Sequence, residues 1–175
     1  LKGNGPEGDI VVSSRMRLAR NLIGFRFGDF MSEDEQSLLE SHLKDRVVDS
    51  TFGNSMKYYS MGELSPLDQL VLLECHLISM EHFKADHLRG VAYDESGTVS
   101  IMINEEDHLR IQVLSAGLAL KEQLDRINSI DDVLAERLSY SFDTDFGYLT
   151  TCPTNVGTGL RVSVMLHLPA LGLSK

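Results

Sequence analysis

The sequence predicts an α+β fold in which a largely antiparallel β-sheet is flanked by helices. Short segments with alternating polarity come in pairs joined by polar turns, as in β-hairpins. Helical stretches are grouped between these pairs, so a parallel βαβ arrangement is not favoured. The chain has 175 residues, 42% of them hydrophobic, which is enough for one well-packed domain.

Composition and charge exclude several classes of protein. The formal net charge of −10 argues against a nucleic-acid binder, which needs a positive field. No apolar run is long enough to span a membrane, and no signal-peptide pattern occurs. Cys75 and Cys152 lie far apart, so we expect no disulfide framework and a cytoplasmic location.

The first strand is expected within Asp9–Leu18, after a flexible arm at residues 1–8. Ser13, Arg15 and Arg17 alternate onto one face of this strand. The other face carries Val12, Ser14, Met16 and Leu18. Residues two apart on a strand are about 7 Å from each other. That spacing suits successive phosphates, although a solvated strand face with incidental arginines is the alternative.

Two helices are expected next, separated by a connector at residues 49–62. Ser32 and Glu35 form a capping box for a helix over Met31–Ser50. Ser65 and Pro66 open the second helix. We expect its apolar stripe to be buried, with Cys75 as a small core residue. The side expected to be buried carries Leu67, Leu70, Val71, Leu73, Glu74 and Leu77.

A cluster of acids follows the strands expected at Gly90–Tyr93 and Thr98–Ile103. Residues 104–107 read Asn-Glu-Glu-Asp, and His108, Arg110 and Gln112 share one face of the next strand. The acids form either a solvated turn or a catalytic carboxylate cluster. Because neighbouring acids repel, the pKa of at least one should be raised, which suits a general base.

Helices are then expected at Leu118–Asn128 and from Ser129 to about Tyr140, followed by a loop at Phe142–Gly147. From Tyr148 a short strand leads through Cys152 into a loop with Gly157 and Gly159. The final strand begins at Leu160. Its two faces are expected to carry Arg161, Ser163, Met165 and His167, and, as core, Leu160, Val162, Val164, Leu166 and Leu168.

Arginines thus occur on one alternating face of three separate strands: Arg15 and Arg17, Arg110, and Arg161. In an acidic chain this indicates a pocket for a polyphosphate. The sequence has no GxxxxGK[ST] loop and no HRD motif, so neither the P-loop nor the protein-kinase device is present.

Three motifs resemble those of the ATP:guanido phosphotransferases, the family of the creatine and arginine kinases. They are Ser13-Ser-Arg-Met-Arg17, Asn104-Glu-Glu-Asp-His-Leu-Arg110 and Cys152-Pro-Thr-Asn-Val-Gly-Thr-Gly-Leu-Arg161. Further stretches, such as His76-Leu-Ile-Ser79, resemble the bacterial protein-arginine kinase branch of the McsB type. The resemblance implies the catalytic-domain fold that guanido kinases share with glutamine synthetase.

The resemblance also implies roles for individual residues. Glu106 would hold the acceptor guanidinium and act as base, Glu105 and Asp107 would assist, and Cys152 would sit beside the guanidinium as a thiolate. ATP would be bound with Mg²⁺, which would be held mainly by the nucleotide and water. No protein metal ligand is expected. The ATP-binding residues implied are Ser13, Ser14, Arg15, Met16, Arg17, His76, Arg110, Arg161, Val162, Ser163, Val164 and Met165.

By this resemblance, residues 9–175 would be the front portion of a guanido kinase catalytic domain, incomplete at its C-terminus and weakly active or inactive alone. The expected activity is phosphorylation of arginine side chains in proteins. The alternatives are a phosphagen kinase acting on free arginine or creatine, and a non-catalytic nucleotide-binding regulatory module. The resemblance further implies a CtsR-like repressor and unfolded proteins as substrates, an McsA-like activator, a Clp protease as partner, and a homodimer.

Overall fold

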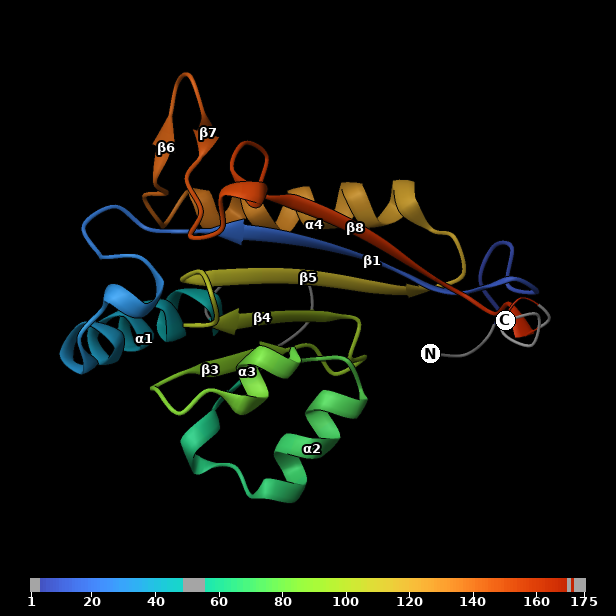
Figure 1. Cartoon of the computed structure of the whole chain (residues 1–175), viewed down its shortest axis with the longest axis horizontal. Helices are drawn as coiled ribbons and strands as arrows, with labels where there is room; N and C mark the ends of the chain where they lie inside the picture. Colours follow the sequence, from blue (N-terminus) through green and yellow to red (C-terminus); the bar gives the residue numbers. More distant parts are fainter. Residues whose placement is uncertain (1–3, 49–55, 170, 172–175) are drawn as a thin grey trace.

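The computed structural model describes residues 4–48, 56–169 and 171 (Figure 1). Its centre is a six-stranded sheet with the order β2–β3–β4–β5–β1–β8, in which every neighbouring pair is antiparallel. The predicted fold class is confirmed. The strands are β1 (Val11–Arg20), β2 (Lys57–Ser60), β3 (Gly90–Tyr93), β4 (Val99–Ile103), β5 (Leu109–Ala116) and β8 (Leu160–Leu166).

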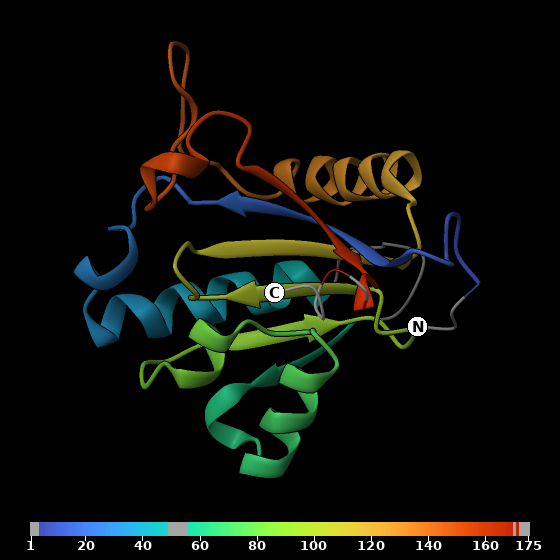
Figure 2. The same cartoon turned by 45° about the vertical axis from the view of Figure 1, so that its right-hand side comes forward.

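Helices cover the two faces of the sheet unequally (Figures 1 and 2). Helix α1 (Glu33–Val48) contacts β2, β3 and β4, and helix α4 (Leu120–Ala135) contacts β1 and β5. Both enclose the main core, which includes Leu39, Ile111 and Ile127. On the other face, α2 (Pro66–Glu74) and α3 (Met80–Lys84) lie over β3 and β4 around a smaller core that includes Met102. Neither of these two helices extends over β5, β1 and β8, so the open part of that face is available for a site.

The two predicted helix starts are confirmed by their caps. Ser32 N donates to Glu35 Oε2 at 2.8 Å, and Glu35 N donates back to Ser32 Oγ at 3.3 Å, which is a capping box. Ser65 Oγ accepts from Asp68 N at 3.2 Å, with Pro66 in the first turn of α2. Residues 1–3 of the expected arm and residues 49–55 of the expected connector lie outside the described residues. The expectation of a connector is wrong for residues 57–60, which form β2.

The prediction of two helices between residues 118 and 140 is wrong, because α4 runs without a break through Ser129. Ile127, Ile130 and Leu134 are buried at helical spacing across the expected junction, and Asp131 pairs with Arg20 of β1 at 2.6 Å. Tertiary contacts on both sides of Ser129 therefore override its capping tendency. None of the helices in the described part of the chain is long and apolar enough to cross a membrane.

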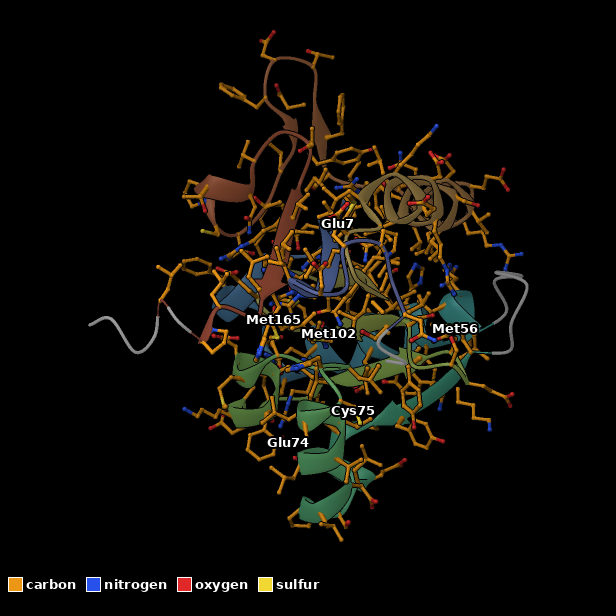
Figure 3. The ribbon with its side chains drawn as sticks, turned by 90° about the vertical axis from the view of Figure 1, so that its right-hand side faces the viewer. Glu7, Met56, Glu74, Cys75, Met102 and Met165 are labelled. Atoms are coloured by element: carbon orange, nitrogen blue, oxygen red, sulfur yellow. The ribbon has the colours of Figure 1, made fainter. Side chains whose placement is uncertain are left out.

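The prediction that the apolar stripe of α2 is buried is wrong for most of the stripe, although Leu77, just after the helix, is buried. Leu72 is its buried residue, whereas Leu67, Leu70 and Val71 are exposed. Cys75, which caps the C-terminal end of α2, is exposed rather than part of the core (Figure 3). The reason is geometric: α2 contacts the molecule along one narrow side, and Met102 and Leu77 fill the space beneath it.

The apolar face of β8 was expected to be core, and this is wrong for most of the strand. Val162, Val164 and Leu166 are 44%, 38% and 49% exposed. Strand β8 is an edge strand, and the helix contacts on that side of the sheet come from α4, which lies against β1 and β5. Val12 likewise leaves the core face, because the β1–β8 register shifts between Val11 and Ser13 and makes Val12 a bulge residue.

The segment expected as a loop after α4 forms a small hairpin. Strands β6 (Phe142–Asp143) and β7 (Gly147–Tyr148) pair with each other and project from the body of the molecule (Figure 1). Three short 3₁₀ helices complete the elements: η1 (Gly28–Phe30), η2 (Met61–Glu63) and η3 (Pro153–Asn155).

Candidate active site

A cavity of about 650 Å³ lies on the open face of β5, β1 and β8. Arginines from all three strands line it, although they are far apart in sequence: Arg15, Arg17, Arg110 and Arg161. Sheet pairing explains their convergence, because Arg17 is the direct partner of Arg161, and Arg110 is opposite Ala19. Their placement on one alternating face of each strand makes all of these side chains point to the same side of the sheet.

Arg17 is the most constrained of these arginines. Its side chain is largely buried, at 9% residue exposure, and its Nε has no hydrogen-bond partner. Burial, followed by the charges of Arg110, Arg15 and Arg161, lowers the pKa of Arg17 to about 10. A buried, unpartnered donor among like charges is a strong site for an anion, because an anion supplies both the missing acceptor and the missing counter-charge.

A second, smaller pocket of about 300 Å³ adjoins the first, and Arg15 lines both. The other residues that line it are Ser13, His76, Leu114, Ser163, Val164 and Met165. His76 has a left-handed backbone with φ of 59°, and its carbonyl accepts from Gln112 Nε2 at 2.6 Å. This bond ties the end of α2 to the sheet beside the pocket.

Three of the expected nucleotide residues lie elsewhere. Ser14 faces the opposite side of the sheet, where its Oγ donates to the Gly117 carbonyl at 2.7 Å. Met16 lies in the main core, and Val162, the sheet partner of Met16, is exposed. Their side chains do not line either pocket.

The carboxylates of the β4–β5 turn have different environments. Glu105, whose side chain is 3% exposed, accepts from Ser79 Oγ at 2.6 Å and forms a short ion pair with Arg110. Asp107 is also buried, and its Oδ1 accepts from Asn21 Nδ2 and from Thr151 N, each at 2.7 Å. Both acids are therefore held by the protein itself, and they fix the turn against α3, β1 and the loop after β7.

Glu106, between these two acids, is exposed and lines the cavity. Partial burial, followed by the charges of Asp107 and Glu105, raises the pKa of the Glu106 carboxyl. The sequence-based expectation that the acid cluster contains one carboxyl with a raised pKa therefore applies to this residue. A carboxylate of raised basicity at a cavity wall can accept a proton from a bound cation.

His108 shares the signature stretch but does not reach the cavity. It is fully buried, and its Nδ1 accepts from Leu22 N at 3.0 Å while Nε2 lies 2.9 Å from the Arg26 carbonyl. Because one nitrogen accepts and the other faces an acceptor, the ring is the neutral tautomer with its proton on Nε2. Burial lowers its pKa, which agrees with this assignment.

The loop between β7 and β8 borders the cavity through Asn155 and Gly159. Gly159 has φ of +65°, and a Cβ there would lie 2.6 Å from the Ala19 carbonyl oxygen, so only glycine lets the loop approach β1 this closely. Cys152 is half-buried at the start of η3, with its Sγ 3.0 Å from Thr154 Oγ1. It is not among the residues that line the cavity.

Arg20 of β1 holds this loop in place through a hydrogen bond. It is 3% exposed, pairs with Asp131, and donates through Nη1 to the Thr158 carbonyl at 2.9 Å. Its guanidinium carbon also lies 3.6 Å from the centroid of the Tyr148 ring. Arg20 therefore supports the site structurally and does not line the cavity.

Several cavity residues were missed by the sequence analysis, namely Glu81, His82, Ala85 and His87 on and after α3, and Asn155. Ser79, which holds Glu105, was also missed. The one available signal was Ser79 as a helix N-cap, confirmed by its bond from His82 N at 3.0 Å. Within the described residues, no three His, Cys, Asp or Glu side chains gather closely enough to hold a metal ion.

Comparison with known proteins shows the family of the chain. Residues 38–175 match the family described as "ATP:guanido phosphotransferase, C-terminal catalytic domain". The chain belongs to the ATP:guanido phosphotransferase family. Among its relatives are the protein-arginine kinases of Symbiobacterium thermophilum and Bacillus cereus, which are 48% and 46% identical over the whole chain. The chain spans about half the length of these relatives, 50% in each case.

Solved structures of the family have the same fold. A duplicated taurocyamine kinase from Schistosoma mansoni, with bound transition-state analogue components, has a TM-score of 0.85 and 28% identity, covering 94% of this chain and 24% of that one. A lombricine kinase has a TM-score of 0.81 and 26% identity, covering 99% of this chain and 52% of that one. The sequence-based recognition of this family is confirmed.

Proposed function

We propose that this chain contributes the nucleotide site and part of the acceptor site of a protein-arginine kinase, which transfers a phosphoryl group from MgATP to an arginine side chain. The observation that carries the proposal is the composition of the main cavity. Four arginines from three strands face carboxylates of the β4–β5 turn across one space of about 650 Å³. This arrangement suits an anionic donor beside a cationic acceptor.

The arginines fit the phosphates of a nucleotide. Arg17 has an unpartnered buried Nε, and the pKa values of Arg15 and Arg17 are lowered by burial and by repulsion from neighbouring arginines. A triphosphate would relieve that repulsion and accept the free hydrogen bonds. The adjoining pocket, lined by His76, Leu114 and Met165, offers a partly apolar space for the base.

Mg²⁺ would arrive with the nucleotide and neutralise phosphate charge during transfer. Arg15, Arg17 and Arg161 would hold the phosphates from the sheet side. Arg110 would also hold the phosphates, from the start of β5, where its ion pair with Glu105 fixes its guanidinium. Since these groups are already in place, the charge that develops in the transition state would need little reorganisation of the protein.

Glu106 would orient the acceptor guanidinium and take its proton. In the transfer step, a guanidinium nitrogen forms the new N–P bond as the bond between the γ-phosphorus and the bridging oxygen of ATP breaks, and ADP leaves. The proton lost by that nitrogen passes to Glu106, whose raised pKa suits it to this role. Asp107 and Glu105 would hold the turn that positions Glu106, and Cys152 would act from the adjacent loop.

The choice of a protein acceptor rests on the relatives that share 44–48% identity over the whole chain, which are protein-arginine kinases. The second candidate is a kinase for free guanidino compounds, because the solved structures with this fold include taurocyamine and lombricine kinases. The proposal also implies a cytoplasmic location, with unfolded proteins and a CtsR-like repressor as acceptors.

The test has two stages. Calorimetric titration of the chain with MgATP should give one binding site, and Arg17→Gln should lose it while retaining a native circular dichroism spectrum. Transfer is then measured in a version extended to the length of the relatives, with γ-labelled ATP and either an unfolded protein or free arginine as acceptor. Acid-labile label in the protein alone supports a protein-arginine kinase, and label in free arginine alone supports the second candidate. Absence of nucleotide binding would refute the site.

A further inference from the structure

Four carboxylates line the main cavity, and they divide into two kinds. Glu105 and Asp107 are engaged, the first by Ser79 and Arg110, the second by Asn21 and Thr151. The carboxylates of Glu106 and Glu81 have no hydrogen bond or ion pair with any residue in 4–48, 56–169 or 171. Two unpaired carboxylates therefore face the space in which an acceptor would bind.

The position of Glu81 is fixed by the helix that carries it. It is the second residue of α3, and the N-cap of that helix, Ser79, accepts from His82 N at 3.0 Å and donates to Glu105 at 2.6 Å. Ser79 thus joins the start of α3 directly to the acid turn. The charge of Glu81 also acts on Glu106, since it contributes to the raised pKa of that carboxyl. Glu81 and Glu106 therefore belong to one electrostatic environment.

The α3 side of the cavity offers no fixed positive charge among the described residues that line it. These residues are Glu81, His82, Ala85 and His87. His82 is fully buried, and burial together with the charge of Arg89 lowers its pKa to about 3, so the ring is neutral. His87 Nε2 is occupied by the Asn104 carbonyl at 2.7 Å. A negatively charged group on the acceptor would thus find repulsion here and no counter-ion.

We propose that Glu81 is a specificity-determining residue that favours an arginine within a polypeptide over a free guanidino acid. The inference rests on the proposed function and adds to it the residue that selects the acceptor. An arginine within a polypeptide has a cationic guanidinium and neutral backbone amides. The unpaired carboxylates can accept hydrogen bonds from both. Free arginine brings a carboxylate as well, and Glu81 disfavours it by like-charge repulsion.

The test compares two acceptors that differ by one carboxylate, Nα-acetyl-arginine amide and Nα-acetyl-arginine. Their affinities for the MgADP-bound chain are measured by NMR titration. Wild-type protein should prefer the amide, and Glu81→Gln should reduce that preference by about two- to fivefold, the size expected for one exposed charge pair. Glu81→Lys should shift the preference further toward the acid.

Glu74→Gln is the matched control, because it removes the same charge from an exposed position on α2 outside the cavity (Figure 3). It should leave the preference unchanged. If both Glu81 variants keep the wild-type preference and the wild-type affinity for MgATP, the inference about Glu81 is overturned while the proposed function stands. If wild-type protein binds no MgATP, the proposed function fails and the inference fails with it.

Discussion

Arg17 of β1 and Arg161 of β8 are direct partners in the antiparallel sheet. Like charges placed opposite each other in a sheet are destabilising, and here Arg15 and Arg110 add to the repulsion. The described residues do not fully compensate this electrostatic conflict, because the carboxylate of Glu105 is paired with Arg110 and the pKa of Arg17 remains lowered. Conflict of this kind is typical of functional sites.

The first prediction concerns this arginine pair. Arg161→Ala should raise the free energy of unfolding of the ligand-free chain by about 0.2–1 kcal/mol, because the cross-strand repulsion is lost. It should also abolish the stabilisation that MgATP gives to wild-type protein, which is about 2.7 kcal/mol at a hundredfold excess over Kd. Urea unfolding with and without MgATP measures both effects. Lys121→Ala on α4 is the control, and an Arg161→Ala variant that MgATP still stabilises fully would contradict the proposed site.

The second prediction concerns the pH dependence of Glu106. Its pKa is raised in the folded protein, so the ionised carboxylate destabilises the fold above that pKa, and the penalty disappears as the pH falls through it. Glu106→Gln should therefore be slightly more stable than wild type at pH 7 and should lose this advantage on acidification. Urea midpoints across the pH range test this, with Glu122→Gln as a control on α4. An equal difference at every pH would contradict the prediction.

The same carboxyl should shape the rate of transfer. If Glu106 accepts the proton, the rate of phosphoryl transfer should decrease as the pH is lowered, because protonated Glu106 is not a base. The decrease should begin at a higher pH than for an ordinary carboxyl group, because the pKa of Glu106 is raised. In Glu106→Gln, MgATP should bind with wild-type affinity while transfer is lost. Rates measured against pH with saturating acceptor, in a version extended to the length of the relatives, provide the test. Normal turnover by this variant would exclude Glu106 as the base.

The third prediction concerns the buried pair Arg20–Asp131. Arg20→Met leaves the buried carboxylate of Asp131 unpaired and should cost about 3–5 kcal/mol. The double variant Arg20→Met with Asp131→Leu should recover much of this loss, since both charges are then removed. Chemical denaturation of the four proteins in a double-mutant cycle gives the coupling. Equal instability of the single and double variants would show that Arg20 acts mainly through Tyr148 and Thr158.

The fourth prediction concerns Gly159. Gly159→Ala places a Cβ 2.6 Å from the Ala19 carbonyl oxygen at a φ of +65°, so the substitution should cost about 1–3 kcal/mol and displace the loop that borders the cavity. Gly62→Ala is a suitable comparison, because nothing lies within 4 Å of its added Cβ. Thermal unfolding of both variants decides the matter, and a Gly159→Ala variant as stable as Gly62→Ala would refute the close approach.

Much of the site follows from local sequence patterns. Period-two alternation placed Arg15 and Arg17 on one face of β1 and Arg110 on one face of β5, because side chains alternate along any extended strand. Cap chemistry located the starts of α1 and α2 correctly, since a Ser hydroxyl can satisfy the free N–H groups of a helix start wherever the helix packs. The family motifs supplied the rest of the recognition.

The tertiary structure decided what depends on partners distant in sequence. Strand order made β8 an edge, so Val162 and Leu166 are exposed although they alternate like core residues. Packing against β1 kept α4 continuous through Ser129. The three-dimensional contacts of Ser79 and Asn21 separated the engaged acids, Glu105 and Asp107, from the free acid Glu106.

The sequence by itself thus determined the conformation of most segments, the faces of their strands and the chemistry of their side chains, because these depend mainly on neighbours a few residues away. Only the tertiary structure determined which arginines meet, which carboxylates remain unpaired and which apolar faces are covered. These properties depend on strand order and on contacts between residues distant in sequence, such as Arg15 and Ser163, which are 148 positions apart, and no local pattern encodes such distances.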